Sequence, residues 1–161
     1  MRKIINGFTM IELLVVISVI GILTTISVIS FNRYQADSRD TQRSTRVTLL
    51  AEALEKYYDE NGEYPSCNAM TDTATAVTTN TLVGVDKTVL VAPRADSSQT
   101  NSIDFCTDIT SAIPTTDSFA YVGDGSTTCT STGCLEFTLQ YVEEGTGVVK
   151  SIESRRKAAI T

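Results

Sequence analysis

Histidine is absent from the 161 residues of this chain, and so are the P-loop, G-x-G-x-x-G and H-E-x-x-H motifs. Without histidine, Ser-His-Asp and Cys-His arrangements are excluded, because each needs an imidazole base. No N-x-[ST] glycosylation sequon occurs either. We therefore predict that the chain is not an enzyme and takes neither a cofactor nor a small-molecule substrate.

Positive charge is also scarce. The chain has 13 Lys and Arg against 19 Asp and Glu, and from Gly62 onward it has 6 basic and 12 acidic residues. Phosphate contacts need clustered Lys and Arg, so an acidic segment is a poor binder of nucleic acid. The exception is Arg155-Arg156-Lys157. A basic cluster of three residues is more often part of a solvated tail. Nucleic-acid binding is therefore not favoured, but it stays an open alternative.

Charge is almost missing between Phe8 and Phe31, where Glu12 is the only charged residue and proline is absent. As a helix rising ~1.5 Å per residue, these 24 residues span about 36 Å, enough to cross a bilayer. A carboxylate inside such a segment costs ~2.5–3.5 kcal/mol on insertion scales, so Glu12 requires a positive partner. Cleavage after Gly7 would supply one, the new α-amine of Phe8.

Two simpler interpretations explain this segment less well. A secretory signal peptide has a shorter apolar stretch and ends in a small-residue cleavage site, whereas Thr24-Thr25-Ile26-Ser27 is a poor site of that kind. A plain single-pass anchor explains the length but not Glu12. Arg2 and Lys3 precede the apolar segment and place the leader in the cytoplasm by the positive-inside tendency.

The residues Gly7-Phe8-Thr9-Met10-Ile11-Glu12-Leu13 resemble the processing site of type IV pilins and of type II secretion pseudopilins, and the resemblance runs from Met1 to about Pro65. It implies that a prepilin peptidase cleaves after Gly7 and that the Phe8 amine is methylated. It also implies that Glu12 neutralises the N-terminus of a neighbouring subunit. The implied partners are membrane lipid before assembly, an assembly platform with its motor, and further copies of the chain in a helical filament.

The resemblance implies a structural subunit of a type IV pilus. Such a subunit is a single-pass protein of the cytoplasmic (inner) membrane before assembly and part of an extracellular filament afterwards. The alternatives are a type II secretion pseudopilin, or a minor pilin acting as an anchored module for adhesion or DNA uptake. Many family members carry a proline eight residues after the glycine matched by Gly21, but this chain has Ile29 there. Without that proline the helix has one less cause of a kink.

Cysteine is absent before residue 67, and the four that follow are Cys67, Cys106, Cys129 and Cys134. A translocated segment meets an oxidising space, so we expect two disulfides, for which three pairings exist. Cys129 and Cys134 flank a turn-like sequence and suit a small closed loop, which leaves Cys67 with Cys106.

No metal site is predicted. The alternative is that the cysteines bind zinc, but zinc sites favour more closely spaced cysteines or additional histidine ligands. Asp117 and Asp124 are candidates for half of a calcium site. They lack EF-hand spacing, so we interpret them as solvated turn residues.

The patterns predict an α+β fold in which a long N-terminal hydrophobic helix packs its C-terminal half on a small antiparallel sheet, as in type IV pilins. The predicted segments are a leader (1–7), an apolar helix (8–31), an amphipathic helix (32–62), a variable loop region (63–118) and the sheet with a tail (119–161). The amphipathic helix carries an apolar stripe at helical spacing, made of Val47, Leu50, Ala51, Leu54, Tyr57 and Tyr58.

Three strands are expected after residue 118 as an antiparallel meander: Phe119–Val122, Leu135–Val142 and Val148–Ile152. Along the second, Leu135, Phe137, Leu139 and Tyr141 alternate on one face. Turns are expected at Gly123–Gly125 and Glu143–Gly147. Within the loop region we expect a short strand at Thr88–Val91 and a helical turn within Ser102–Ile113.

Overall fold

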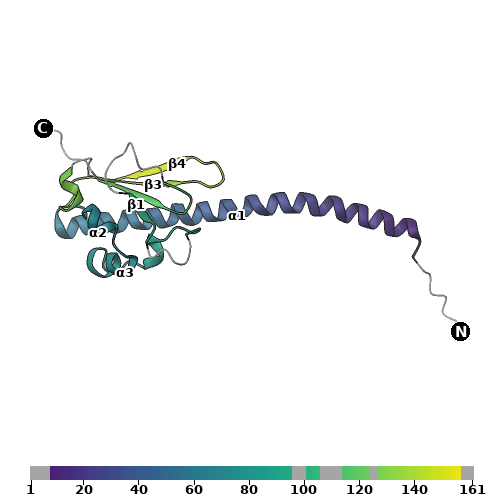
Figure 1. Cartoon of the computed structure of the whole chain (residues 1–161), viewed down its shortest axis with the longest axis horizontal. Coiled ribbons are helices and arrows are strands. Elements are labelled where there is room, and N and C mark those ends of the chain that lie inside the picture. The colour runs from purple at the N-terminus through teal and green to yellow at the C-terminus, as the bar shows by residue number, and fades with distance from the viewer. Residues whose placement is uncertain (1–7, 96–100, 106–113, 124–126, 157–161) are drawn as a thin grey trace. The chain divides into compact units, whose positions relative to one another are not determined.

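Residues 8–95, 101–105, 114–123 and 127–156 are the part of the chain that the computed structural model describes. Contacts divide the chain into two compact units, with the boundary between Ala36 and Asp37. Helix α1 (Met10–Asn61) contributes to both units, and we call the second unit the head. In the head, strands β3 and β4 lie along one side of α1 and α3 lies along the other (Figure 1).

The other elements all belong to the head. The helical ones are α2 (Cys67–Met70), α3 (Ala74–Ala76), a π-helix (Val77–Thr81) and 3₁₀ turns at Lys87–Leu90 and Thr127–Thr130. The strands are β1 (Ile103–Phe105), β2 (Phe119–Gly123), β3 (Phe137–Val142) and β4 (Val149–Glu153).

The first unit contains the apolar part of α1, in which every side chain from Phe8 to Ile26 is exposed. Its hydroxyl groups bond within the helix: Ser18 Oγ donates to the carbonyl of Leu14 at 2.8 Å and Thr25 Oγ1 to that of Ile22 at 2.7 Å. Such bonds satisfy polar groups without water, as a lipid or helix-bundle environment requires. Among the described residues, α1 is the one helix long and apolar enough to cross a membrane.

The predicted apolar stripe is confirmed in the head. Val47, Leu50, Ala51 and Leu54 are buried, with Tyr57 and Tyr58 packed half-buried beside them. They share one core with inward-facing residues of the sheet, among them Phe119, Tyr121, Phe137 and Leu139. Helix and sheet therefore bury each other's apolar faces, which a small sheet needs for stability.

Helix α1 ends where the sequence predicts. Gly62 has a φ of 79°, and its N–H donates to the carbonyl of Tyr58 at 2.8 Å. This is the left-handed cap that glycine adopts without steric cost. The chain then turns back, and Tyr64 pairs with Cys134 in an isolated antiparallel bridge.

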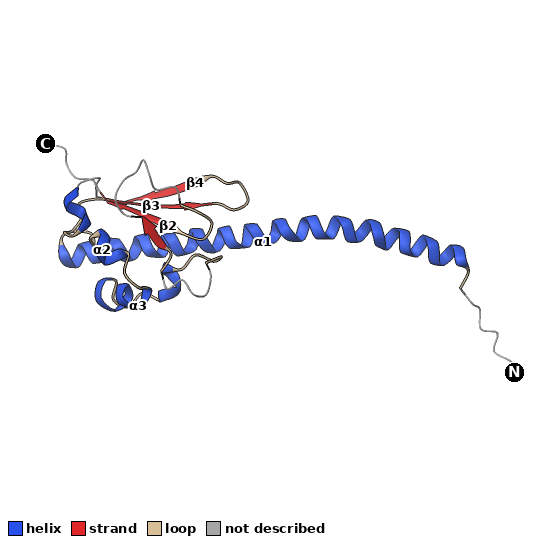
Figure 2. Cartoon of the chain, in the orientation of Figure 1, coloured by secondary structure: helices blue, strands red, loops and turns tan. Residues whose placement is uncertain are grey.

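The sheet has the order β1-β2-β3-β4, and Figure 2 labels the last three of these strands. Strands β2, β3 and β4 form the predicted antiparallel meander, with Tyr121 opposite Leu139 and Leu139 opposite Ile152. Phe137, Leu139 and Tyr141 face the core as predicted. Strand β1 is an addition that the sequence did not suggest, and it pairs with β2 in parallel.

Two local predictions are wrong. Lys87–Leu90 is a 3₁₀ turn instead of a strand, because the side chain of Asp86 accepts the N–H of Thr88 at 2.8 Å and caps it. Leu135 is 56% exposed, because β3 begins at Phe137. Within Ser102–Ile113, where a helical turn is predicted, Ile103–Phe105 is a strand. Residues 106–113 lie outside the described residues, so the helical turn stays a prediction. Residues 124–126 of the predicted turn after β2 lie outside them too.

Cys129 and Cys134 are joined by a disulfide, the small loop that the sequence suggested. Cys67 is also disulfide-bonded. Its predicted partner, Cys106, lies outside the described residues, so that pairing stays a prediction.

Gly123 lies against the Cys129–Cys134 disulfide. A Cβ atom at this position would overlap the Sγ of Cys129 and lie 2.9 Å from the Sγ of Cys134. We expect Gly123→Ala to lower the free energy of unfolding by about 1–3 kcal/mol, as overpacking does. Urea denaturation of the full chain in detergent, followed by tyrosine fluorescence, measures the change. Gly21→Ala is the control, because nothing lies within 4 Å of a Cβ there. Equal stability of Gly123→Ala and the unmodified chain would contradict the expectation.

Candidate functional site

Glu12 lies in the first turn of α1 and forms a capping box with Thr9. The backbone N–H of Thr9 donates to Glu12 Oε2 at 3.0 Å, and the Thr9 hydroxyl donates to the same oxygen at 2.8 Å. In return, the N–H of Glu12 donates to Thr9 Oγ1 at 3.3 Å. Thr9 is the N-cap and Glu12 is the third helical residue, which is the S/T-x-x-E arrangement that fixes where a helix starts.

The capping box leaves half of the carboxylate available. Both Thr9 bonds end on Oε2, and Oε1 of Glu12 makes no hydrogen bond to any described residue. Beside it is a hollow of about 340 Å³ lined by Phe8, Ile11, Glu12, Val15 and Val16. Glu12 therefore lies beside an apolar surface, and a carboxylate attracts a cation more strongly in apolar surroundings than in water.

The structure brings Phe8 and Glu12, two of the predicted site residues, into this one hollow, and Phe8 is 83% exposed. Gly7 lies outside the described residues. Thr9 is a functional candidate that the sequence analysis missed, although its spacing from Glu12 is a readable capping-box signal.

Comparison with known families identifies this segment. The model of the prokaryotic N-terminal methylation motif matches residues 2–28. The chain is also 36% identical over 59 residues to the type IV major pilin protein PilA of Myxococcus xanthus. In this segment the chain is therefore similar to type IV pilins.

Two fimbrial proteins are similar to the chain over longer stretches. The chain is 32% identical over 106 residues to a fimbrial protein of Neisseria meningitidis serogroup A, which covers 61% of this chain and 60% of the relative. It is 32% identical over 77 residues to the fimbrial protein EcpC of Eikenella corrodens, covering 48% of this chain and 50% of the relative. The match to the Myxococcus protein covers 37% of this chain and 27% of that relative. No solved structure gives a significant match.

The head holds a polar cluster centred on Glu144, in the turn between β3 and β4. Arg39 bonds both carboxylate oxygens, at 2.6 and 2.8 Å, and Arg43 and Arg94 bond it at 3.2 and 3.1 Å. Asp40 accepts the backbone N–H of Glu144 at 2.7 Å. The cluster ties the turn to α1 within the head.

The arginines lower the pKa of Glu144 to about 2, chiefly through the hydrogen bonds from Arg39. A carboxyl group whose pKa falls on folding stabilises the fold above its unfolded pKa, ordinarily about 4.5, and loses that contribution as the pH falls toward 2.

We therefore expect acid to destabilise the head partly through Glu144. From pH 7 to pH 3, this one group should remove on the order of 2 kcal/mol from the free energy of unfolding. Urea denaturation across this range measures the slope. Glu144→Gln should be less stable at pH 7 and should lose less stability on acidification. An unchanged slope in Glu144→Gln would show that other carboxyl groups control the acid response.

Proposed function

We propose that this chain is the structural subunit of a type IV pilus filament, processed by a prepilin peptidase and assembled by bundling of its N-terminal helices. The observation that carries the proposal is the exposed apolar part of α1, with Glu12 and its available oxygen in the first turn. The methylation-motif match over residues 2–28 and the pilin relatives support it.

Processing creates the charge that assembly uses. Cleavage after Gly7 removes Arg2 and Lys3, changes the net charge from −6 to −8, and leaves an α-amine on Phe8. Methylation of that amine preserves its positive charge. Phe8, which carries this amine, lines the same hollow as Glu12.

Glu12 pairs with the amine of a neighbouring copy. Its own chain already occupies Oε2 through Thr9, so the neighbour's Phe8 amine binds Oε1 without breaking the capping box. The apolar faces of adjacent helices pack around this pair and exclude water, which strengthens it. Helices that are offset along the filament axis and joined by this contact, one after another, form the filament core.

The proposal also specifies the partners of the chain and its location in the cell. Before assembly the apolar helix holds the chain in the inner membrane, with the leader in the cytoplasm and the head outside. A motor-driven platform then supplies the work of lifting the helix out of lipid, after which the chain is part of an extracellular filament.

The test is imaging of filaments sheared from cells that make the chain, with mass spectrometry of their main subunit. The proposal predicts filaments in which this chain is the most abundant protein. Filaments built mainly from another pilin, with this chain present in trace amounts, would instead indicate a minor pilin. Absence of the chain from surface filaments, with export through a secretion system depending on it, would indicate a pseudopilin.

A further inference from the structure

We propose that the polar side chains where α1 enters the head form a mechanical clasp, which stops the helix from uncoiling further when it is pulled. The clasp consists of Arg39, Asp40 and Arg43 of α1 and of Glu144 and Gly145 in the turn between β3 and β4. This inference goes beyond the proposed function, because it concerns the response of a single chain to tension. Tension arises whenever the head is pulled away from whatever holds the apolar part of α1.

The part of α1 that precedes the head is a helix with exposed side chains. Exposure extends from Phe8 to Ile26 and from Phe31 to Gln35. In a single chain under tension, the hydrogen bonds of the helix itself are what opposes uncoiling of this part. Each residue that uncoils lengthens the chain by about 2 Å, because a rise of ~1.5 Å becomes an extended spacing of ~3.3–3.6 Å. Uncoiling therefore advances along α1 toward the head.

The clasp lies at the first turns of α1 that belong to the head. Arg39 donates to both carboxylate oxygens of Glu144, at 2.6 and 2.8 Å. Asp40 accepts the backbone N–H groups of Glu144 at 2.7 Å and of Gly145 at 2.9 Å. A pull that uncoils α1 from its N-terminal end thus reaches these bonds before it reaches Val47, where the apolar core of the helix begins.

Arg43 ties the same turns of α1 to a third segment of the head. Its side chain is fully buried, and it bonds Asp40 at 2.7 Å and Glu144 at 3.2 Å. It also donates twice to the carbonyl of Thr116, at 2.8 and 3.1 Å. A buried guanidinium that loses its acceptors is costly, so the bonds of this network support one another. The clasp therefore holds α1 more firmly than exposed ion pairs, which contribute little.

The clasp fits α1 only while these turns are helical. Arg39 and Arg43 both bond Glu144, because residues four apart lie on one face of a helix. In an extended chain, residues four apart are about 13 Å from each other instead of about 6 Å, so the set of bonds cannot be kept intact. The clasp therefore binds the helical form selectively and raises the free energy that uncoiling of residues 39–46 requires.

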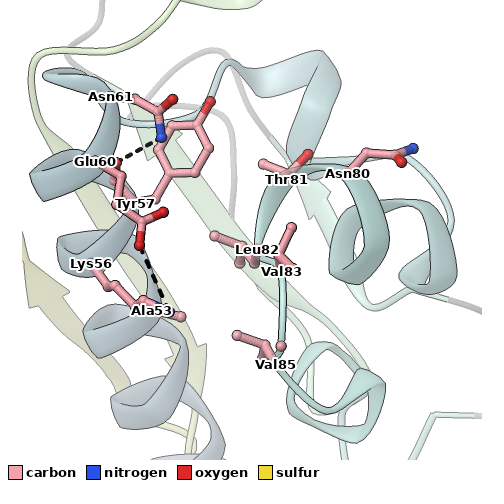
Figure 3. A pocket seen from close by; sticks show the side chains of 11 residues that line it. Ala53, Lys56, Tyr57, Glu60, Asn61, Asn80, Thr81, Leu82, Val83 and Val85 are labelled. Atoms are coloured by element: carbon pink, nitrogen blue, oxygen red, sulfur yellow. Dashed lines mark hydrogen bonds and ion pairs between the residues drawn. The ribbon is translucent and has the colours of Figure 1, made fainter.

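Pulling the full chain in detergent with optical tweezers tests the clasp, with one handle at the N-terminus and the other at Val83. Val83 is 66% exposed, lies on the segment across from Lys56 and Tyr57 of α1 (Figure 3), and is not part of the clasp. The unmodified chain should first lengthen by about 55 Å, as residues 10–38 uncoil. It should then hold until the head opens at a higher force.

Replacing Asp40 and Glu144 together, as Asp40→Ala and Glu144→Ala, removes the bonds from α1 to the turn that these two side chains make. The first step should then lengthen by about 15 Å more, because uncoiling continues to Val47. Gly123→Ala is the control for stability alone, because it crowds the disulfide and leaves the clasp intact. It should lower the force at which the head opens and leave the length of the first step unchanged.

A milder pair of variants decides the question if the double variant does not fold. Arg39→Ala removes a half-buried side chain and keeps the buried Arg43, and it should shorten the time for which the clasp holds by about tenfold at equal force. Glu143→Gln changes the neighbouring carboxylate of the same turn and should leave that time unchanged. Equal holding times in these two variants would overturn the inference, as would a first step of unchanged length in a folded double variant. Neither result bears on filament assembly, so the proposed function would stand.

Discussion

Glu12→Leu is expected to abolish filaments while leaving export and cleavage normal. Leucine removes the desolvation cost of the carboxylate, ~2.5–3.5 kcal/mol on insertion scales, so the monomer sits more favourably in the bilayer. The same change removes the group that binds a neighbour's Phe8 amine. Counting sheared filaments and measuring cleaved monomer in membranes separates the two effects. Wild-type filament numbers in Glu12→Leu would show that Glu12 is not the assembly charge.

Glu12→Gln is the matched variant, because it separates the charge of Glu12 from its capping role. Glutamine also serves in a capping box, so the bonds with Thr9 and the start of α1 are retained. It carries no charge for the amine of another subunit. We expect Glu12→Gln to assemble as poorly as Glu12→Leu. Normal assembly of Glu12→Gln alone would assign Glu12 to helix capping instead.

Arg43→Ala is expected to cause the largest loss of head stability, about 3–5 kcal/mol of unfolding free energy. The Arg43 side chain is fully buried, bonds Asp40 at 2.7 Å and Glu144 at 3.2 Å, and donates twice to the carbonyl of Thr116 at 2.8 and 3.1 Å. Its removal leaves Asp40 and the Thr116 carbonyl without their cationic donor and opens a cavity.

Urea denaturation of the full chain in detergent measures this loss, with Lys56→Ala as the control. Lys56 is 69% exposed and reaches Glu60 at only 3.8 Å, so its removal should change the unfolding free energy by less than about 1 kcal/mol. An Arg43→Ala head as stable as Lys56→Ala would show that the buried cluster adds no net stability.

The sequence predicted those parts of the fold in which local periodicity and core position agree. Val47, Leu50 and Leu54 repeat at helical spacing and line the core, and Phe137, Leu139 and Tyr141 alternate as a half-buried strand does. Strand β1 was missed because it is three residues long and is defined by pairing with β2, which no local pattern encodes. Leu135 was misplaced because alternation continues beyond the point where strand pairing begins.

The candidate site was predictable in part for similar reasons. A single carboxylate in an apolar segment drew attention to Glu12, and the adjacent motif drew attention to Gly7 and Phe8. The Glu144 cluster was not predictable, because no local pattern distinguishes Arg39 and Arg43 from the other charged residues of the helix. Their partner lies about a hundred residues later, and only the fold brings them together.

The central claim is that this chain is cleaved after Gly7 and assembled through the new N-terminus. The most direct test is the intact mass of the subunit recovered from sheared filaments, measured without proteolysis. The account predicts a chain that begins at Phe8, lacks residues 1–7 and carries one added methyl group. A filament subunit that retains Met1, or one that begins near Ser27, would contradict it.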